Sequence, residues 1–174
     1  MQEHLELAQR WLDREDSECR EGRIDRLVWL ASVLPAAEFL AFPGGWMAKQ
    51  LYEEPRYCFA YAQFLAAIVL GFAFIEHTLA ATFYASDRND LERASASVLF
   101  REAVGIGWLS AEEHAWLERA KEFRNPVTHF RRPGYKDTVE HRSVTENEVP
   151  YSILEEDARH VILAAMRLLK KGAF

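Results

Sequence analysis

Residues 57–75 read YCFAYAQFLAAIVLGFAFI, a run of 19 residues without a charged side chain. This length is close to the ~20 residues that a helix needs to span a bilayer. Gln63 lies inside the run, however, and Glu76 and His77 follow it directly. A helix that is apolar on all sides is equally typical of the middle of a helical bundle or of a dimer interface.

The flanks of this run favour the buried alternative. Basic residues border it on one side alone, at Arg56, and the chain contains no second apolar run of this length. The uncharged sequence also resumes after His77 and continues through Ser86. We therefore predict a core helix from about Arg56 to Tyr84, without membrane insertion. The alternative is a membrane-associated effector that uses residues 57–75.

The composition is that of a folded, mostly helical chain. Of 174 residues, 49% are hydrophobic and 13% aromatic, which excludes a disordered chain and suits one domain. The 8 glycines and 6 prolines are few for a fold rich in strands and turns. Cys19 and Cys58 form neither a metal-binding spacing nor a disulfide framework, and the N-terminus lacks the apolar run of a secretory signal. We therefore expect a cytoplasmic protein without a metal or other cofactor.

Apolar positions at helical spacing predict helices along the whole chain. The N-terminal helix places Leu5, Ala8, Trp11 and Leu12 on one face. Pro35 is expected to kink or split the next helix, from Ile24 to Phe42, and a turn follows at 42–45. After the core helix and a polar loop at 86–90 we expect further helices at 91–104, from 111, and before the C-terminus.

Local signals mark the ends of these helices. Gly105-Ile106-Gly107 is typical of a helix end, and Ser110 and Ser152 each begin a capping box with a glutamate three residues later. The polar stretch 133–151 is expected to be a long loop, with or without a short hairpin. The prediction is an all-α bundle of five to six helices that forms a single domain over residues 1–174.

A basic cluster surrounds the sequence Arg124-Asn125-Pro126-Val127-Thr128-His129. Residues 119–136 contain six Lys or Arg and one acid, Glu122, although the whole chain has a formal charge of −6. A histidine with an ordinary pKa of about 6.5 exchanges protons near neutrality. Arginine and histidine in a positive patch are typical of a site that handles phosphodiesters. The structural alternatives are a surface histidine, a solvated basic face, and a helix cap at Asn125.

Helix geometry alone does not bring the two key residues together. Arg124 and His129 are five residues apart, which separates them by about 140° on a regular helix. Pro126 leaves two alternatives, because it removes one helical N–H group and disfavours helical backbone at Asn125. Either the helix from Ala111 kinks at Pro126, or it ends there and Asn125 caps a new helix. A second copy of the chain is a further source of complementary groups.

The segment 124–129 resembles the signature of HEPN domains, the higher-eukaryote and prokaryote nucleotide-binding family: Arg, a polar residue, then His after four to six intervening positions. Residues 103–112, AVGIGWLSAE, are similar to the helix, glycine turn and capped helix that precede this element. Glu76 resembles a polar residue that faces the motif in these domains. The resemblance covers about residues 56–169, with the N-terminal helices at 2–42 packing on this core.

The resemblance implies an up-and-down bundle that forms a homodimer and cleaves RNA without a metal. Arg124 would stabilise the charge of the scissile phosphate, Asn125 would orient the phosphate or the histidine, and His129 would act as general acid or base. Attack by the ribose 2′-OH would give a 2′,3′-cyclic phosphate. Glu76 would support Arg124, and four further residues would bind RNA: Lys121, Arg131, Arg132 and Lys136.

The biological role implied is a toxin or a defence effector, with an antitoxin protein as a further partner. Some toxin members carry a tyrosine two positions after the histidine, which a partner enzyme modifies; here that position is Arg131, so this modification is not expected. Glu76 and His77 suggest a metal pair, but no third ligand stands at helical spacing. The alternative for Glu76 is a buried ion pair with Arg124, because a charge on so apolar a helix needs a partner. The alternative function is a non-catalytic helical module that binds RNA, a nucleotide or a protein.

Overall fold

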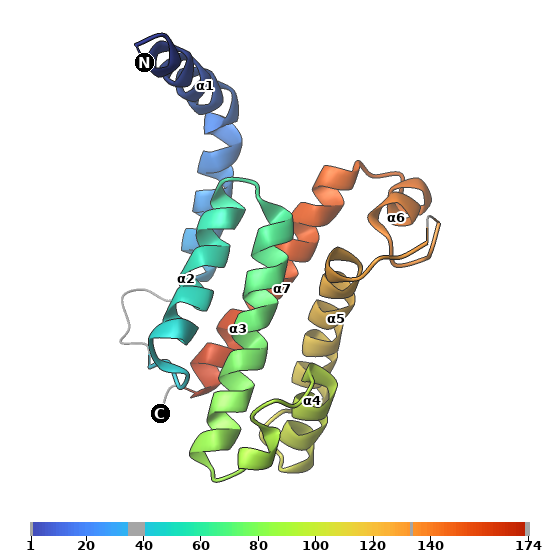
Figure 1. Ribbon diagram of the computed structural model, residues 1–174. Helices are drawn as coiled ribbons and strands as arrows, with labels where there is room; N and C mark the ends of the chain where they lie inside the picture. The colour runs from blue at the N-terminus through green and yellow to red at the C-terminus, as the bar shows by residue number, and fades with distance from the viewer. Residues whose placement is uncertain (1, 35–40, 133, 173–174) are drawn as a thin grey trace.

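The computed structural model describes residues 2–34, 41–132 and 134–172, and over these ranges the protein is all-α (Figure 1). The described residues form no strand. This confirms the predicted all-α bundle. The elements are α1 (Gln2–Val33), α2 (Gly45–Ala60), α3 (Phe64–Ala85), the 3₁₀-helix η1 (Asn89–Leu91), α4 (Ala96–Gly105), α5 (Ala111–Thr128), α6 (Val139–Glu146) and α7 (Pro150–Gly172).

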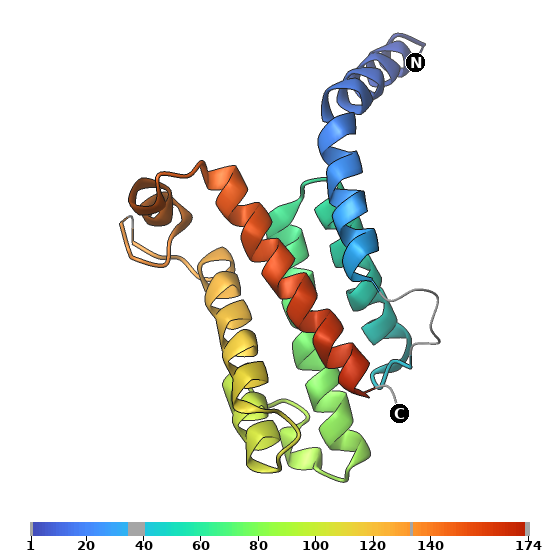
Figure 2. The ribbon, with the colours of Figure 1, turned by 180° about the vertical axis from the view of Figure 1, so that it is seen from behind.

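Helix α3 is the centre of the bundle and packs against α2, α5 and α7 (Figures 1 and 2). Its side chains Phe72, Phe74, Ile75 and Leu79 are completely buried. Burying such side chains stabilises a fold by about 1.5–3 kcal/mol each. The apolar helix predicted from the sequence is therefore the core helix of the protein.

The uncharged run 57–75 does not form one helix, contrary to the prediction for residues 56–84. Helix α2 ends at Ala60 and α3 begins at Phe64, and the tight turn between them places Ala62 in the left-handed conformation, with φ 59°. The run is thus divided between two helices that lie side by side (Figure 1). Among the described helices only α3 is long and apolar enough to cross a membrane, and half of that segment is buried within the bundle.

Over residues 2–33, the two helices predicted before residue 42 form one long helix instead, whereas the kink or split expected at Pro35 lies outside the described residues. Helix α1 runs without interruption to Val33 and ends before Pro35, which lies outside the described residues. Proline disfavours helical backbone at the residue before it, which explains this end. The turn expected at 42–45 is present, and the Gly45 N–H donates to the Phe42 carbonyl at 2.9 Å.

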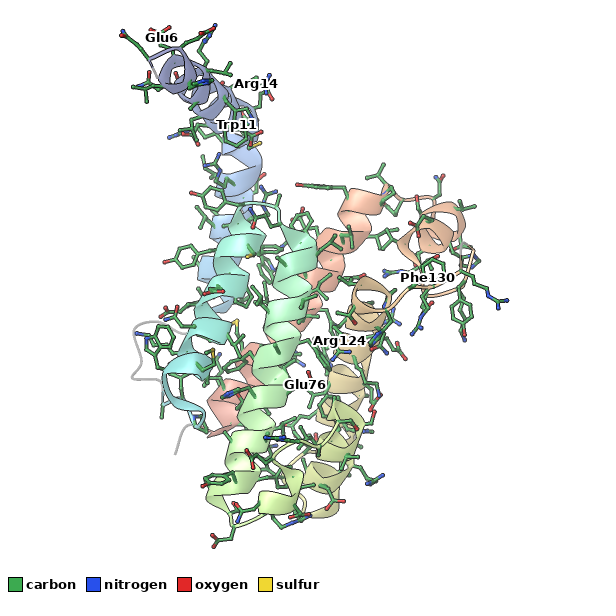
Figure 3. The ribbon with its side chains drawn as sticks, in the orientation of Figure 1. Glu6, Trp11, Arg14, Glu76, Arg124 and Phe130 are labelled. Atoms are coloured by element: carbon green, nitrogen blue, oxygen red, sulfur yellow. The ribbon has the colours of Figure 1, made fainter. Side chains whose placement is uncertain are left out.

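Only the second half of α1 packs on the bundle. Trp29 meets the ring of Phe59 at 4.9 Å, and Arg26 and Leu30 are the buried residues of α1. The first half projects beyond the other helices, and Trp11 on it is 53% exposed (Figure 3). The predicted packing of the N-terminal region on the core therefore applies to this second half.

Two of the predicted helix ends before α5 are confirmed. Gly107 has a positive φ of 75° after α4. The Ser110 hydroxyl accepts from the Glu113 N–H, and the Glu113 carboxylate accepts from the Ser110 N–H, so the first capping box is complete. Helix α4 begins at Ala96 rather than at residue 91, because residues 89–91 form the 3₁₀-helix.

The structure differs from the prediction between α5 and α7. The stretch 133–151 contains α6 rather than a hairpin, and the Thr138 hydroxyl caps α6 by accepting from the His141 N–H. The capping box predicted at Ser152 is wrong, because α7 begins at Pro150 and includes Ser152. Proline suits the first position of a helix, where its missing N–H would have no partner.

Candidate active site at the end of helix α5

The motif 124–129 lies at the C-terminal end of α5. The helix continues through Pro126 to Thr128, so the alternative in which it ends at Pro126 and Asn125 caps a new helix is wrong. His129 follows as the capping residue in an extended conformation, with φ −129° and ψ 130°. Its backbone N–H donates to the Asn125 carbonyl at 2.9 Å. No new helix begins at Asn125, which is itself part of α5.

Arg124 lies between α3 and α5. Its Nη2 is 3.3 Å from the Glu76 carboxylate, its Nη1 donates to the Asn125 side-chain oxygen at 3.4 Å, and its guanidinium lies 4.7 Å from the ring centre of Phe72. In Figure 3, Glu76 and Arg124 are found on these two helices. The predicted pair of Glu76 and Arg124 is therefore confirmed, as a half-buried pair with 32% and 22% of the two side chains exposed.

His129 is exposed at the end of the helix. Among the described residues, its ring forms no hydrogen bond or ion pair, and no polar contact joins it to Arg124. The next residue, Phe130, is 87% exposed in the loop beyond α5 (Figure 3). One chain thus brings Arg124, Asn125 and Glu76 together and leaves His129 apart from them.

Most of the basic side chains around the motif are neutralised. Arg119 pairs with Glu122 at 2.8 Å and Arg131 with Asp137 at 3.4 Å. Lys121 pairs with Glu118 and also donates to the Ser97 hydroxyl at 2.9 Å. Arg132 and Lys136 are exposed and form no ion pair within the described part of the chain. The local positive field is therefore smaller than the count over residues 119–136 indicated, because three of the neutralising acids lie outside that window: Glu76, Glu118 and Asp137.

An open cleft of about 430 Å³ separates the end of α5 from α6. Of the predicted site residues, Asn125 and Lys136 line it. The cleft contains equal numbers of basic and acidic side chains, so its walls are close to neutral. The other lining residues are Arg119, Glu122, Phe123, Asp137, Arg142 and Glu146.

An ion pair that we did not predict from the sequence holds α6 to α7. Arg142 Nη1 is 2.6 Å from the carboxylate of Asp157, which is 3% exposed, and its guanidinium lies 5.3 Å from the ring centre of Phe123. Burial raises the pKa of Asp157 above its ordinary range, although Arg142 opposes this rise. The sequence does contain a signal for a buried acid, because Asp157 lies four residues from both Ile153 and Val161 and therefore on the apolar face of α7.

His160 of α7 packs beside Phe123, the residue that Arg142 covers. Its ring is half-buried, stacks on Trp116 at 4.4 Å and meets Phe123 at 5.3 Å. Its Nε2 lies 3.0 Å from the Trp116 carbonyl. Burial lowers the pKa of His160, which favours the neutral ring. This histidine has a packing role.

Within the described residues, no group of three or more His, Cys, Asp or Glu side chains is arranged to hold a metal ion. Cys19 and Cys58 are free thiols. The site at the end of α5 therefore consists of an anchored arginine with its carboxylate and amide neighbours, and an exposed histidine.

Comparison of the chain with protein-family models, with curated protein sequences and with solved structures found no match. The resemblance to HEPN domains therefore rests on the residues of the chain itself.

Proposed function

We propose that this chain is a metal-independent endoribonuclease of the HEPN type that acts in the cytoplasm as a homodimer. The observation that carries the proposal is the anchoring of Arg124. A guanidinium held by Glu76, Asn125 and Phe72 has a fixed position, and a fixed cation stabilises developing charge on a phosphate without reorganisation. The all-α bundle around it suits the same family.

The proposed reaction uses the two parts of the motif on one phosphodiester. His129 removes the proton of the ribose 2′-OH, and the 2′-oxygen attacks phosphorus while Arg124 binds a phosphate oxygen. The bond from phosphorus to the 5′-oxygen breaks, and the leaving oxygen takes a proton from a protonated histidine or from water. The products are a 2′,3′-cyclic phosphate and a free 5′-OH.

The separation of Arg124 from His129 supports a composite site. In one chain the arginine is tied to α3 and the histidine lies at the exposed end of α5. A second copy, placed against this end, would supply a histidine from outside the α3–α5 interface. Arg132 and Lys136 would then bind flanking phosphates as exposed cations. A toxin or defence role follows from this activity.

Cleavage of a labelled RNA by the full chain in EDTA tests the proposal. We expect His129→Ala to reduce the rate by roughly 10²–10⁴-fold and Arg124→Ala by roughly 10²–10³-fold. Matched controls are His4→Ala and Arg101→Ala, which change exposed residues far along the chain and should retain activity. A 2′-deoxy substitution at the cleaved position should abolish cleavage. Activity that persists in both site variants would refute the assignment.

A second candidate function is RNA binding without cleavage. The pairing of Arg119, Lys121, Arg124 and Arg131 with acids favours it, because few free cations remain to stabilise a transition state. This alternative predicts salt-sensitive RNA binding with no cleavage products. The same gel assay, combined with a binding titration at two salt concentrations, distinguishes the two functions.

A further inference from the structure

We propose that the chain binds a 5′-mononucleotide in a second cleft, where α1 crosses the turn between α2 and α3 and the start of α7. The cleft has a volume of about 410 Å³ and its walls come from these three regions. Ligand pockets in proteins commonly have volumes of about 300–1,000 Å³. The proposal does not depend on the ribonuclease activity, because none of the residues 124–136 lines this cleft.

The strongest evidence is Arg26, a buried cation without an anionic partner. Only 8% of this residue is exposed, yet no acidic side chain of the described residues lies within ion-pair distance of it. Its Nε donates to the Ala60 carbonyl at 3.1 Å, and its guanidinium lies 5.8 Å from the ring centre of Phe64. The four N–H groups on Nη1 and Nη2 form no hydrogen bond within the described chain. The two Nη atoms are not among the fully enclosed atoms without a partner, so they have access to the cleft and can pair there with a bound anion.

Gly22 makes room for this guanidinium. A Cβ at position 22 would lie 3.2 Å from Nη1 of Arg26 and 3.6 Å from Nη2. Glycine inside a helix is unfavourable relative to alanine, and the close approach of Arg26 supplies the reason for it here. The neighbouring Arg23 donates from Nη1 to Asp16 at 2.9 Å and from Nη2 to the Glu15 carbonyl at 3.4 Å, and its Nε is buried. The unused donors of the cleft are therefore the Nη groups of Arg26, which suit the oxygens of one phosphate.

The remaining walls suit a nucleobase. Tyr61 and Tyr151 line the cleft and are 59% and 53% exposed. The Arg23 guanidinium lies 4.7 Å from the ring centre of Tyr61, and the Phe64 ring meets Tyr151 edge-on at 4.9 Å, so a base would stack on the ring surfaces that remain exposed. Glu15 and Glu18 line the side that belongs to α1. Their carboxylates accept hydrogen bonds from the amino group of a base, and they disfavour a ligand with several negative charges. A monophosphate of an amino-bearing base satisfies both sets of groups, whereas a triphosphate does not.

Calorimetric titration of the full chain with GMP, UMP and inorganic phosphate tests this inference. We expect GMP to bind more tightly than UMP, which has no amino group, and more tightly than phosphate. Arg26→Met should weaken GMP binding by roughly 10- to 100-fold, as the loss of charge-assisted hydrogen bonds implies. Arg20→Met is the matched control, because Arg20 is an exposed residue of α1 that does not line the cleft.

Gly22→Ala keeps the test decisive if Arg26→Met unfolds the chain. Alanine favours the helix, so α1 should remain folded, while the new methyl group displaces the guanidinium and GMP binding should weaken. Arg124→Ala should leave GMP binding unchanged, which separates this inference from the ribonuclease proposal. The inference is overturned by the absence of GMP binding at about 5 mM, by equal affinity for GMP and phosphate, or by unchanged binding in Gly22→Ala.

Discussion

Replacement of Arg142 by methionine tests the ion pair that joins α6 to α7. Methionine retains much of the side-chain volume but leaves Asp157 buried without its cation. The pair is well shielded, with side-chain exposures of 16% for Arg142 and 4% for Asp157. Arg142 also covers the ring of Phe123, so the change removes a cation–π contact as well.

The expected cost follows from this burial. Removing one partner of a buried pair costs about 3–5 kcal/mol. Helix α6 contains no buried residue, so in the variant it can detach from α7 and allow water to reach Asp157. Hydration of Asp157 limits the loss of unfolding free energy. We therefore expect a loss of about 2–3 kcal/mol at pH 7. For a chain of this size that corresponds to a decrease in Tm of roughly 4–12 °C.

The pH dependence gives a second, independent readout. Burial raises the pKa of Asp157, and loss of Arg142 should raise it further. The folded variant then takes up a proton at a pH where the unfolded chain remains ionised, and this uptake stabilises the folded state as pH falls. The difference between variant and wild type should therefore be smaller at pH 5 than at pH 7.

Urea denaturation followed by far-UV circular dichroism at the two pH values measures both effects. The control is Arg101→Met, which changes an arginine whose side chain is 71% exposed and should cost less than about 0.5 kcal/mol. A loss below about 1 kcal/mol at pH 7, or an equal loss at both pH values, would show that the pair does not carry the energy inferred here.

Three further changes probe the core and the helix ends. Gly71→Ala should lower the free energy of unfolding by about 1 kcal/mol, because the new Cβ would lie 2.9 Å from Val161 Cγ1. In the double variant with Val161→Ala this clash should be absent. Burial lowers the pKa of His160, so its share of the stability should be present above pH ~6.5 and lost as pH falls toward the lower folded pKa, and NMR titration should give a midpoint below the ordinary histidine value of about 6.5. Ser110→Ala should cost about 1 kcal/mol by thermal denaturation, since it removes the capping hydroxyl of α5, whereas the exposed Ser17→Ala should not.

The fold class could be predicted because apolar residues at helical spacing dominate the sequence. The turn that divides the uncharged run 57–75 between α2 and α3 was not predicted. The turn at residues 61–63 contains neither glycine nor proline, and Ala62 takes the left-handed conformation although it has a Cβ. No local signal identifies such a turn. Pro55 lies buried inside α2, where its Cβ is 3.9 Å from the position that a Cβ on Gly71 would take.

The candidate site was predicted in part. An isolated carboxylate on an apolar helix needs a partner, and this requirement identified the pairing of Glu76 with Arg124. The charge balance around the motif was wrong because it was counted over adjacent residues. Helix geometry pairs Lys121 with Glu118 three residues earlier, and the loop returns Asp137 to Arg131. Such contacts depend on where the chain turns, which composition does not show.

In the proposed ribonuclease, the pair of Glu76 and Arg124 would determine how the end of α5 binds a phosphate. The charge of this pair is balanced, so attraction of RNA would depend on the exposed Arg132 and Lys136. The contacts of Arg124 with Glu76 and Asn125 are long, at 3.3 and 3.4 Å, and a phosphate oxygen at ordinary hydrogen-bond distance would compete well with them. In the proposed site, Glu76 would therefore hold the guanidinium in place before substrate arrives. The apolar helix that forms the core of the fold thus also positions the cation of the proposed site.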